Sequence, residues 1–500
     1  MQKSVDAAAP DPTPDDSLPI GRAFRLITIG GLLQTIGETL ALGASGAIAT
    51  GNALVIFCST ALGVALLCAA LWQPGGQQSA PTQRRQPLAS ARLGWLRRLA
   101  KSGLLVLLLL AALWTIATGG ALLIQHPLDP SIYDSDAAAF IHYQAEDVLR
   151  GVNPYTDIHG FWNAVVQFPH AGATPLQRGQ FARQTLSPDD AAVAALLHLY
   201  VQDPSHAGPE FDPASLHSYP AGSFLLAVPF IWAGFASTQP LYALCLLLLF
   251  ALLMRWSPQG WRWQTALLLL SLSIAITLTL RSSFEVACML CIIGAWRVQA
   301  RHPWAAAFLL GVGCSIKQLA WLFLPFYLLW ALRQRGWRTA TLAGVICAGV
   351  FLLINAPFLL AAPSAWASSM LLPITEPAFP GGIGLITLAQ GGLIQLFPSW
   401  AYSALEIAAY LGGMGWFSAQ QFGSRAGSTT ISRAGTWGLI LAPLPLLLGS
   451  RSLISYTMFL PVLALAALFQ YIHFRCLDSS SAKPLSALTS STTGAALSNE

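Results

Sequence analysis

Long apolar runs constrain the fold of this chain more than any other feature. The runs LLVLLLLAALWTIATGGALLI (104–124) and TLAGVICAGVFLLINAPFLLAA (341–362) contain no charged residue, and roughly 20 such residues cross a bilayer as a helix. The whole chain is 55% hydrophobic and only 9% charged. Because lipid offers backbone groups no hydrogen-bond partner, spanning segments must be helical. The sequence therefore predicts an all-α polytopic membrane protein.

The segment 73–102 predicts how the chain is oriented. It contains cations and no acidic residue; these are Arg84, Arg85, Arg92, Arg97, Arg98 and Lys101. Short basic connections stay in the cytoplasm. We therefore expect a disordered cytoplasmic tail over 1–25, and two added spans with a basic cytoplasmic connection over 26–102. The next span then carries residues 125–218 to the extracytoplasmic face.

This large loop, 125–218, is unlike the rest of the chain. It holds eleven of the 21 acidic residues and seven of the nine histidines. Loops longer than about 15 residues are usually functional or disordered. Apolar stretches such as FIHYQAEDVL favour short helices near the membrane surface over disorder.

The positions of arginines predict the number of crossings. If residues 219–254 cross the membrane once, three arginine groups become cytoplasmic: Arg255 and Arg262, Arg297 and Arg301, and Arg333, Arg335 and Arg338. The turns RSSFE (281–285) and SIKQ (315–318) and the segment 373–384 then face outwards. We expect about 12 transmembrane helices, within a range of about 11 to 14.

Localisation and partners follow from the same patterns. We expect a multi-pass protein of the cell (plasma or inner) membrane with both termini cytoplasmic, ending in a disordered Ser/Thr-rich tail over 475–500. The lipid bilayer is then its main surroundings. Nucleic acid is excluded as a partner, because no exposed basic run is interleaved with aromatic residues.

Charged residues within apolar runs are costly and mark candidate sites. Lys317, in LLGVGCSIKQLAWLFLPF, has apolar sequence on both sides; a phosphate or carboxylate partner is favoured over a lysine that only reaches to the interface. Arg281 and Glu285 are four residues apart, so on a helix they could pair with each other. Arg451 is a further external cation, and Glu38 lies in the first apolar run, where packing or a partner would account for it.

Asp134 and Asp136 lie just beyond the span 103–124, at the start of a predicted helix that ends at RGVNPY. Acidic residues also favour helix N-termini simply through the helix dipole. Near a set of cations, however, they suit the transfer of a group from a lipid phosphate: a carboxylate takes a proton from the attacking hydroxyl, and the cations stabilise the leaving phosphate. The same pair could hold a divalent cation, magnesium or manganese.

The order of these motifs resembles a known family. An acidic residue in the first large external loop is followed by Phe140, LRGVNPY, SYPAGSFLLAVP and an intramembrane lysine in GCSIKQLAWLFLPFYLLWALRQRGWR. This order resembles the GT-C superfamily of membrane glycosyltransferases, nearest to the bacterial polyprenyl-phosphate-mannose-dependent mannosyltransferase-like proteins. The resemblance covers residues from about 103 to about 470, and residues 103–474 are expected to form a GT-C-like catalytic domain.

The resemblance implies roles for individual residues. Asp136 matches the loop aspartate that acts as base, with Asp134 assisting. Tyr219 matches the start of a YPP element, whose second proline is Ala221 here. The expected phosphate-binding residues are Lys317, Arg281 and Arg451, and the expected substrate-binding residues are Tyr219, Glu285, Gln318 and Glu376.

The expected function is the transfer of a hexose, with mannose favoured, from a polyprenyl-phosphate donor to an envelope glycolipid, polysaccharide or protein acceptor. The resemblance implies an extracytoplasmic reaction with inversion. Two alternatives remain open. A secondary transporter would also show broken spans with intramembrane charges, though usually with internal repeats and midplane sites. A non-catalytic envelope protein could share the fold without the activity.

Overall fold

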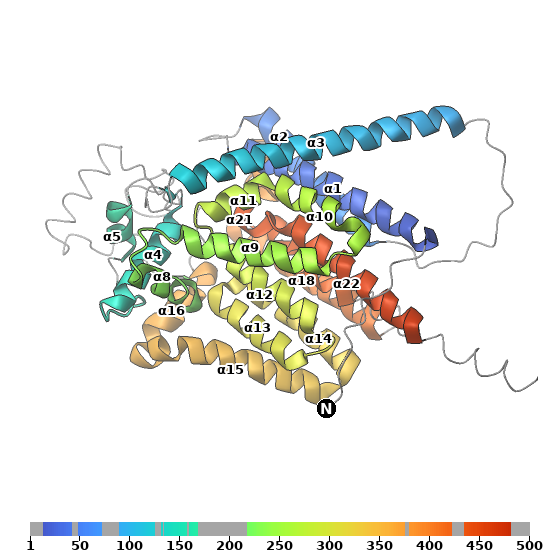
Figure 1. The fold of residues 1–500 in the computed structure, drawn as a ribbon. Helices are drawn as coiled ribbons and strands as arrows, with labels where there is room; N and C mark the ends of the chain where they lie inside the picture. The colour runs from blue at the N-terminus through green and yellow to red at the C-terminus, as the bar shows by residue number, and fades with distance from the viewer. Residues whose placement is uncertain are drawn as a thin grey trace, which may run out of the picture.

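The structure, a computed structural model, is built from helices that run alongside one another (Figure 1). It describes residues 14–42, 49–72, 90–125, 132–133, 135–157, 160–168, 218–375, 380–422 and 435–481. Within these ranges the only strands are β1 (Gly381–Gly382) and β2 (Arg451–Ser452), which pair in parallel. The described part of the chain is therefore the helical protein that its apolar runs predict.

Three helices form the N-terminal part: α1 (Pro14–Leu42), α2 (Thr50–Leu71) and α3 (Ser90–Gln125). The first two pack so closely that a Cβ on Gly30 would lie only 2.7 Å from the carbonyl oxygen of Gly63. Small residues permit such close approach between helices in membranes. Because α1 begins at Pro14, residues 14–25 are helical, which differs from the disordered tail expected there; residues 1–13 lie outside the described part.

Two short helices follow in the acidic loop: α4 (Asp136–Leu149) and α5 (Gly160–Gln167). They pack against each other, and with α8 they gather at one end of the helical bundle (Figure 1). Short helices are what the apolar stretches of this loop predict. The remainder of the loop, 169–217, lies outside the described residues.

The central part of the chain, 218–375, is described without interruption. Its elements are α7 (Gly222–Leu225), α8 (Val228–Trp232), α9 (Gln239–Trp256), η4 (Gln259–Trp261), α10 (Arg262–Ser271), α11 (Ser273–Leu280), α12 (Glu285–Val298), α13 (Pro303–Ile316), η5 (Gln318–Leu322), α14 (Leu324–Arg335), α15 (Trp337–Ala361) and α16 (Pro363–Thr375). Proline occupies the first turn of α9, α13 and α14, where its missing N–H has no helical partner to lose.

The C-terminal part contains α17 (Leu385–Gln390), α18 (Ser399–Phe422), α20 (Gly438–Leu441), η6 (Leu444–Leu447), α21 (Ile454–Thr457) and α22 (Leu460–Ser481). Helix α22 is central: its apolar stretch is 83% buried, and it contacts α1, α2, α12 and α20. It continues to Ser481, so residues 475–481 are helical although they were expected to belong to the disordered tail.

Five helices in the described ranges are long and apolar enough to cross a membrane, or six if the bent pair Gln259–Ser271 and Ser273–Leu280 forms one span. The span expected over 103–124 is among them. Between residues 219 and 254 only Gln239–Trp256 qualifies, while Gly222–Trp232 is a shorter broken helix. The structure is thus consistent with an all-α membrane protein, and the expected 12 or so crossings remain a prediction.

The arginines that were expected on one face lie close together. The charges of Arg301 and Arg255 act on Arg297, and Arg335 donates a hydrogen bond to the carbonyl oxygen of Ala300. Arg255 and Arg335 lie in the last turns of α9 and α14, which point away from α4 and α5 (Figure 1). These four arginines therefore gather at one end of the bundle, and the membrane face on which they lie stays a prediction.

Candidate functional site

Lys317 lies where helix α13 breaks. The helix ends at Ile316, the backbone of Lys317 is extended, and η5 begins at Gln318. A side chain on Gly222 could not fit against this break, because its Cβ would lie 2.5 Å from the carbonyl oxygen of Ser315. The break thus lets α7 pack directly on the end of α13, and Lys317 points into the protein with only 4% of its surface exposed.

The partner of Lys317 is Glu285, the first residue of α12. The ammonium donates a hydrogen bond to the Glu285 carboxylate, and both side chains are buried. The hydroxyl of Ser283 donates to the other carboxylate oxygen. Glu285 and Lys317, which are 32 positions apart in the sequence, are therefore joined at the end of the bundle where α12 begins and α13 ends. This pairing provides the carboxylate partner expected for Lys317, and Glu285, expected to contact substrate, directly holds the lysine.

Three aromatic rings surround the Lys317 ammonium. Its Nζ atom lies 4.6 Å from the ring centroid of Phe284, 4.8 Å from that of Tyr456 and 5.7 Å from that of Tyr219. Cations are attracted to ring faces at such distances. An ammonium group has three N–H donors, and among the described residues Lys317 donates a hydrogen bond to Glu285 alone. Its other neighbours are therefore ring faces, and contact with an anionic ligand stays a prediction.

Tyr219 connects this cluster to the acidic loop. Its ring packs on Phe284 with centroids 4.9 Å apart, and its carbonyl oxygen accepts a hydrogen bond of 2.9 Å from the hydroxyl of Tyr155. Desolvation raises the pKa of Tyr219, and the positive charges of Lys317 and Arg451 oppose that rise. Tyr219 therefore lies in the field of two of the three expected phosphate-binding cations, Lys317 and Arg451.

The neighbours of Tyr219 are held by hydrogen bonds. Gln318 donates to the carbonyl oxygen of Ser218, so this residue, expected to bind substrate, positions the chain just before Tyr219. The backbone N–H of Ala221 donates to Asn355 Oδ1 at 3.0 Å, and Trp366 donates to the same oxygen at 3.2 Å. The segment around Tyr219 is thus fixed between η5 and α15.

The turn from Arg281 to Phe284 is strained. Ser282 has a φ of 70°, the one positive φ among the described residues other than glycine. Its hydroxyl oxygen is buried without a hydrogen-bond partner among those residues. Backbone strain of this kind gathers at ligand sites, where the surrounding structure over-determines it. Arg281, which directly precedes Ser282, ends α11 and is partly buried.

Arg451 is placed by the small sheet. It pairs with Gly381 in the parallel β1–β2 register, and Ser452 pairs with Gly382. A Cβ on Gly382 would lie 2.1 Å from the carbonyl oxygen of Ser452, and the φ of Gly382 is +135°. Only glycine permits this close approach. The pairing fixes the chain on which Arg451 and, five residues later, Tyr456 reach towards the cluster around Lys317.

Asp136 begins helix α4. Ser135 caps the helix by accepting a hydrogen bond of 3.3 Å from the N–H of Ala138, and Asp136 Oδ1 accepts one of 2.7 Å from the N–H of Ala137. The side chain of Asp136 is partly exposed. The carboxylate therefore complements the helix dipole, and its role as the base stays a prediction.

Helix α7 lies between the two halves of the site. This four-residue helix contacts both α4, which begins at Asp136, and α13, which ends just before Lys317. A helix with its side chains is about 10 Å across. Helices α4 and α13 therefore share α7 as a common neighbour.

Two predicted site residues, Asp134 and Glu376, lie outside the described residues. Among the described residues, no group of three or more His, Cys, Asp or Glu side chains could hold a metal ion. Because Asp134 is one of the two expected ligands, its divalent-cation site stays a prediction.

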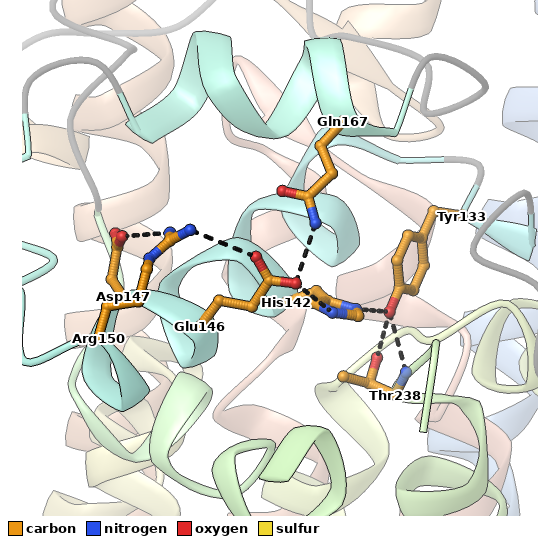
Figure 2. A network of polar contacts seen from close by, with 7 residues as sticks. All are labelled: Tyr133, His142, Glu146, Asp147, Arg150, Gln167 and Thr238. Carbon is orange, nitrogen blue, oxygen red and sulfur yellow. Dashed lines mark hydrogen bonds and ion pairs between the residues drawn. The ribbon is translucent and has the colours of Figure 1, made fainter. Parts of the chain in front are cut away.

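A polar network that the sequence did not predict holds α4 in place (Figure 2). The hydroxyl of Tyr133 lies 2.6 Å from His142 Nδ1 and accepts a hydrogen bond of 2.9 Å from the N–H of Thr238. His142 Nε2 lies 3.2 Å from Glu146 Oε1, which also accepts from Gln167 at 2.9 Å. The network joins α4 and α5 to the start of α9.

The i, i+4 spacing of His142 and Glu146 was the available signal for this network. The sequence contains no signal for the contacts with Thr238, which is far away along the chain. Tyr133 lies three residues before Asp136, so the network anchors the chain just ahead of the candidate base.

Asp147, on another side of α4, is a buried carboxyl group with a raised pKa. Burial raises its pKa to about 6, although Arg150, which donates a hydrogen bond of 2.8 Å, opposes the shift. A folded-state pKa above the unfolded value of about 3.9 favours the protonated carboxyl in the fold. Its contribution to stability is therefore greatest at low pH and is lost as pH rises through about 6.

We expect the wild type to gain about 1 kcal/mol of stability between pH 7 and pH 5 that Asp147→Asn does not gain. Thermal unfolding of both proteins in detergent at the two pH values measures this difference. An equal change in melting temperature for the two proteins would contradict the assignment.

The comparisons with known proteins bear on this same region. Residues 217–371 match the model of glycosyltransferase family 87. The match contains Tyr219, Arg281, Glu285 and Lys317, and it supports a membrane glycosyltransferase. Comparison with curated proteins and with solved structures finds no match.

Proposed function

We propose that this protein transfers a hexose, with mannose favoured, from a polyprenyl-phosphate donor to an envelope glycolipid, polysaccharide or protein. The proposed reaction takes place on the extracytoplasmic side of the cell membrane. The observation that carries this proposal is the buried Lys317–Glu285 pair, located beside Tyr219 and one short helix away from α4. It lies within the region that matches a glycosyltransferase family.

The proposed chemistry assigns a step to each group. Asp136 removes the proton from an acceptor hydroxyl, whose oxygen forms a bond to the anomeric carbon of the sugar. The bond from that carbon to the phosphate oxygen breaks, and the electron pair leaves with the lipid phosphate. Because attack and departure occur on opposite sides, the anomeric configuration inverts.

The buried cation suits the leaving group. Negative charge grows on the phosphate as the bond breaks, and a fixed ammonium in surroundings of low dielectric stabilises it strongly. Glu285 offsets the cost of keeping Lys317 charged in the absence of donor. Arg451 and Arg281 are the further cations proposed to contact the phosphate.

The donor can be tested directly. Membranes containing the protein are incubated with radiolabelled polyprenyl-phosphate-mannose, polyprenyl-phosphate-glucose or the corresponding nucleotide sugars, with membranes lacking the protein as control. We expect label to move from a polyprenyl-phosphate sugar into a lipid, polymer or protein fraction only when the protein is present. Transfer from the nucleotide sugars, with none from the lipid phosphates after endogenous lipid synthesis is blocked, would overturn the proposal.

A further inference from the structure

Glu38 is a buried acidic residue that the proposed reaction does not use. It lies on α1 with 2% of its surface exposed, outside the region that matches the glycosyltransferase family. A buried carboxyl group is costly unless hydrogen bonds compensate it. The contacts of Glu38 therefore show which part of the structure the buried carboxyl group holds in place.

The contacts of Glu38 lead to the segment 451–457. Gln34, one helical turn earlier, donates a hydrogen bond of 2.8 Å to Glu38 Oε1, and the hydroxyl of Thr457 lies 3.3 Å from the same oxygen. Gln34 also donates to the carbonyl oxygen of Thr457 at 2.5 Å. Gln34 and Thr457 are themselves buried, at 1% and 0% exposed. The carbonyl oxygen of Thr457 is thus held by α1, and its hydroxyl lies within hydrogen-bond distance of both Glu38 and, at 3.2 Å, the carbonyl oxygen of Ile454.

Segment 451–457 carries two groups of the candidate site. Arg451 lies at its start, and Tyr456, whose ring lies 4.8 Å from the Lys317 ammonium, directly precedes Thr457. At the start of the segment, β1 holds the chain: Ile383 donates to the carbonyl oxygen of Ser452 at 2.9 Å. The segment is therefore fixed at both ends, by β1 at Arg451 and by α1 at Thr457.

We infer that Glu38 is a positioning residue of the candidate site, acting through Thr457 to hold Tyr456 and Arg451 towards Lys317. Helix α1 is then part of the structure that positions the site. The effect on catalysis rests on the proposed function, whereas the effect on the segment does not.

Two variants separate positioning from folding. Glu38→Ala removes the acceptor of Gln34 and Thr457, while Glu38→Gln keeps an oxygen in the same place. The matched control is Thr28→Val, because Thr28 is buried on the same helix about 15 Å away and donates only to the carbonyl oxygen of Phe24. Melting temperature in detergent verifies that each variant is folded.

Hydrogen–deuterium exchange tests the segment without any assay of activity. We expect the amides of 453–457 to exchange about tenfold faster in Glu38→Ala, with those of α12 unchanged and with wild-type exchange in Glu38→Gln and Thr28→Val. Unchanged exchange at 453–457, or equal acceleration in Thr28→Val, would overturn the inference.

Kinetics with the lipid-phosphate donor test the consequence for the site. We expect Glu38→Ala to raise the donor KM roughly tenfold, Glu38→Gln to stay within about twofold, and Glu38→Ala combined with Thr457→Val to equal the larger single effect. Additive effects would show that Glu38 does not act through Thr457. A wild type that transfers no sugar, with faster exchange in Glu38→Ala, would contradict the proposed function while leaving the positioning intact.

Discussion

Replacing Lys317 with methionine is expected to lower the rate of sugar transfer by about 100-fold or more, the usual cost of removing a group that stabilises transition-state charge. It is also expected to destabilise the protein by about 3–5 kcal/mol, because Glu285 would remain as a buried carboxylate without its cation. Transfer is measured with the labelled donor, and stability by chemical unfolding in detergent.

The double variant Lys317→Met with Glu285→Met separates the two effects. It removes both charges of the pair, and replacing a buried pair by apolar side chains is often neutral for stability. We expect stability to return to within about 1 kcal/mol of the wild type, while transfer stays about 100-fold low. A double variant that transfers sugar at the wild-type rate would show that the ammonium has no role in the reaction.

Asp136→Asn is expected to reduce transfer by about 10²- to 10⁴-fold, since general base catalysis contributes about that much. Stability should change by less than about 1 kcal/mol, because asparagine keeps the shape of the side chain and only one charge at the helix N-terminus is lost. The assay is again label transfer from the lipid-phosphate donor, with melting temperature as the measure of folding.

Asp157→Asn is the matched control for this variant. Asp157 is a carboxylate of the same loop, but its charge acts on Asp147 and Tyr143, away from the start of α4. It should retain wild-type transfer. Full transfer by Asp136→Asn, together with loss in Asp134→Asn, would move the role of base to Asp134.

The helical, membrane-embedded character of the protein follows from sequence alone. Runs such as 104–124 have one viable structure in lipid, because their backbone groups can only bond within the same segment. The sequence also predicts that arginines gather at one end of the bundle, because helices that alternate in direction would return their basic ends to the same side. Local rules of this kind need no knowledge of distant contacts.

The helix limits depended on more than local pattern. Residues 14–25 and 475–481 were predicted to belong to polar tails, yet they are part of helices α1 and α22. A helix that is packed along one part of its length can propagate beyond it at little cost, because each added residue gains a hydrogen bond without a new nucleation step.

Apolar flanking sequence is enough to identify the charged residues of the candidate site, Lys317 foremost. The partners of these residues depend on how separate helices pack against one another. Glu285 pairs with Lys317 across 32 residues, and Glu38 reaches Thr457 across 419. Spacing along one helix predicts contacts three or four residues apart. The partner of a buried charge, by contrast, depends on which side chain the packing of separate helices places beside it.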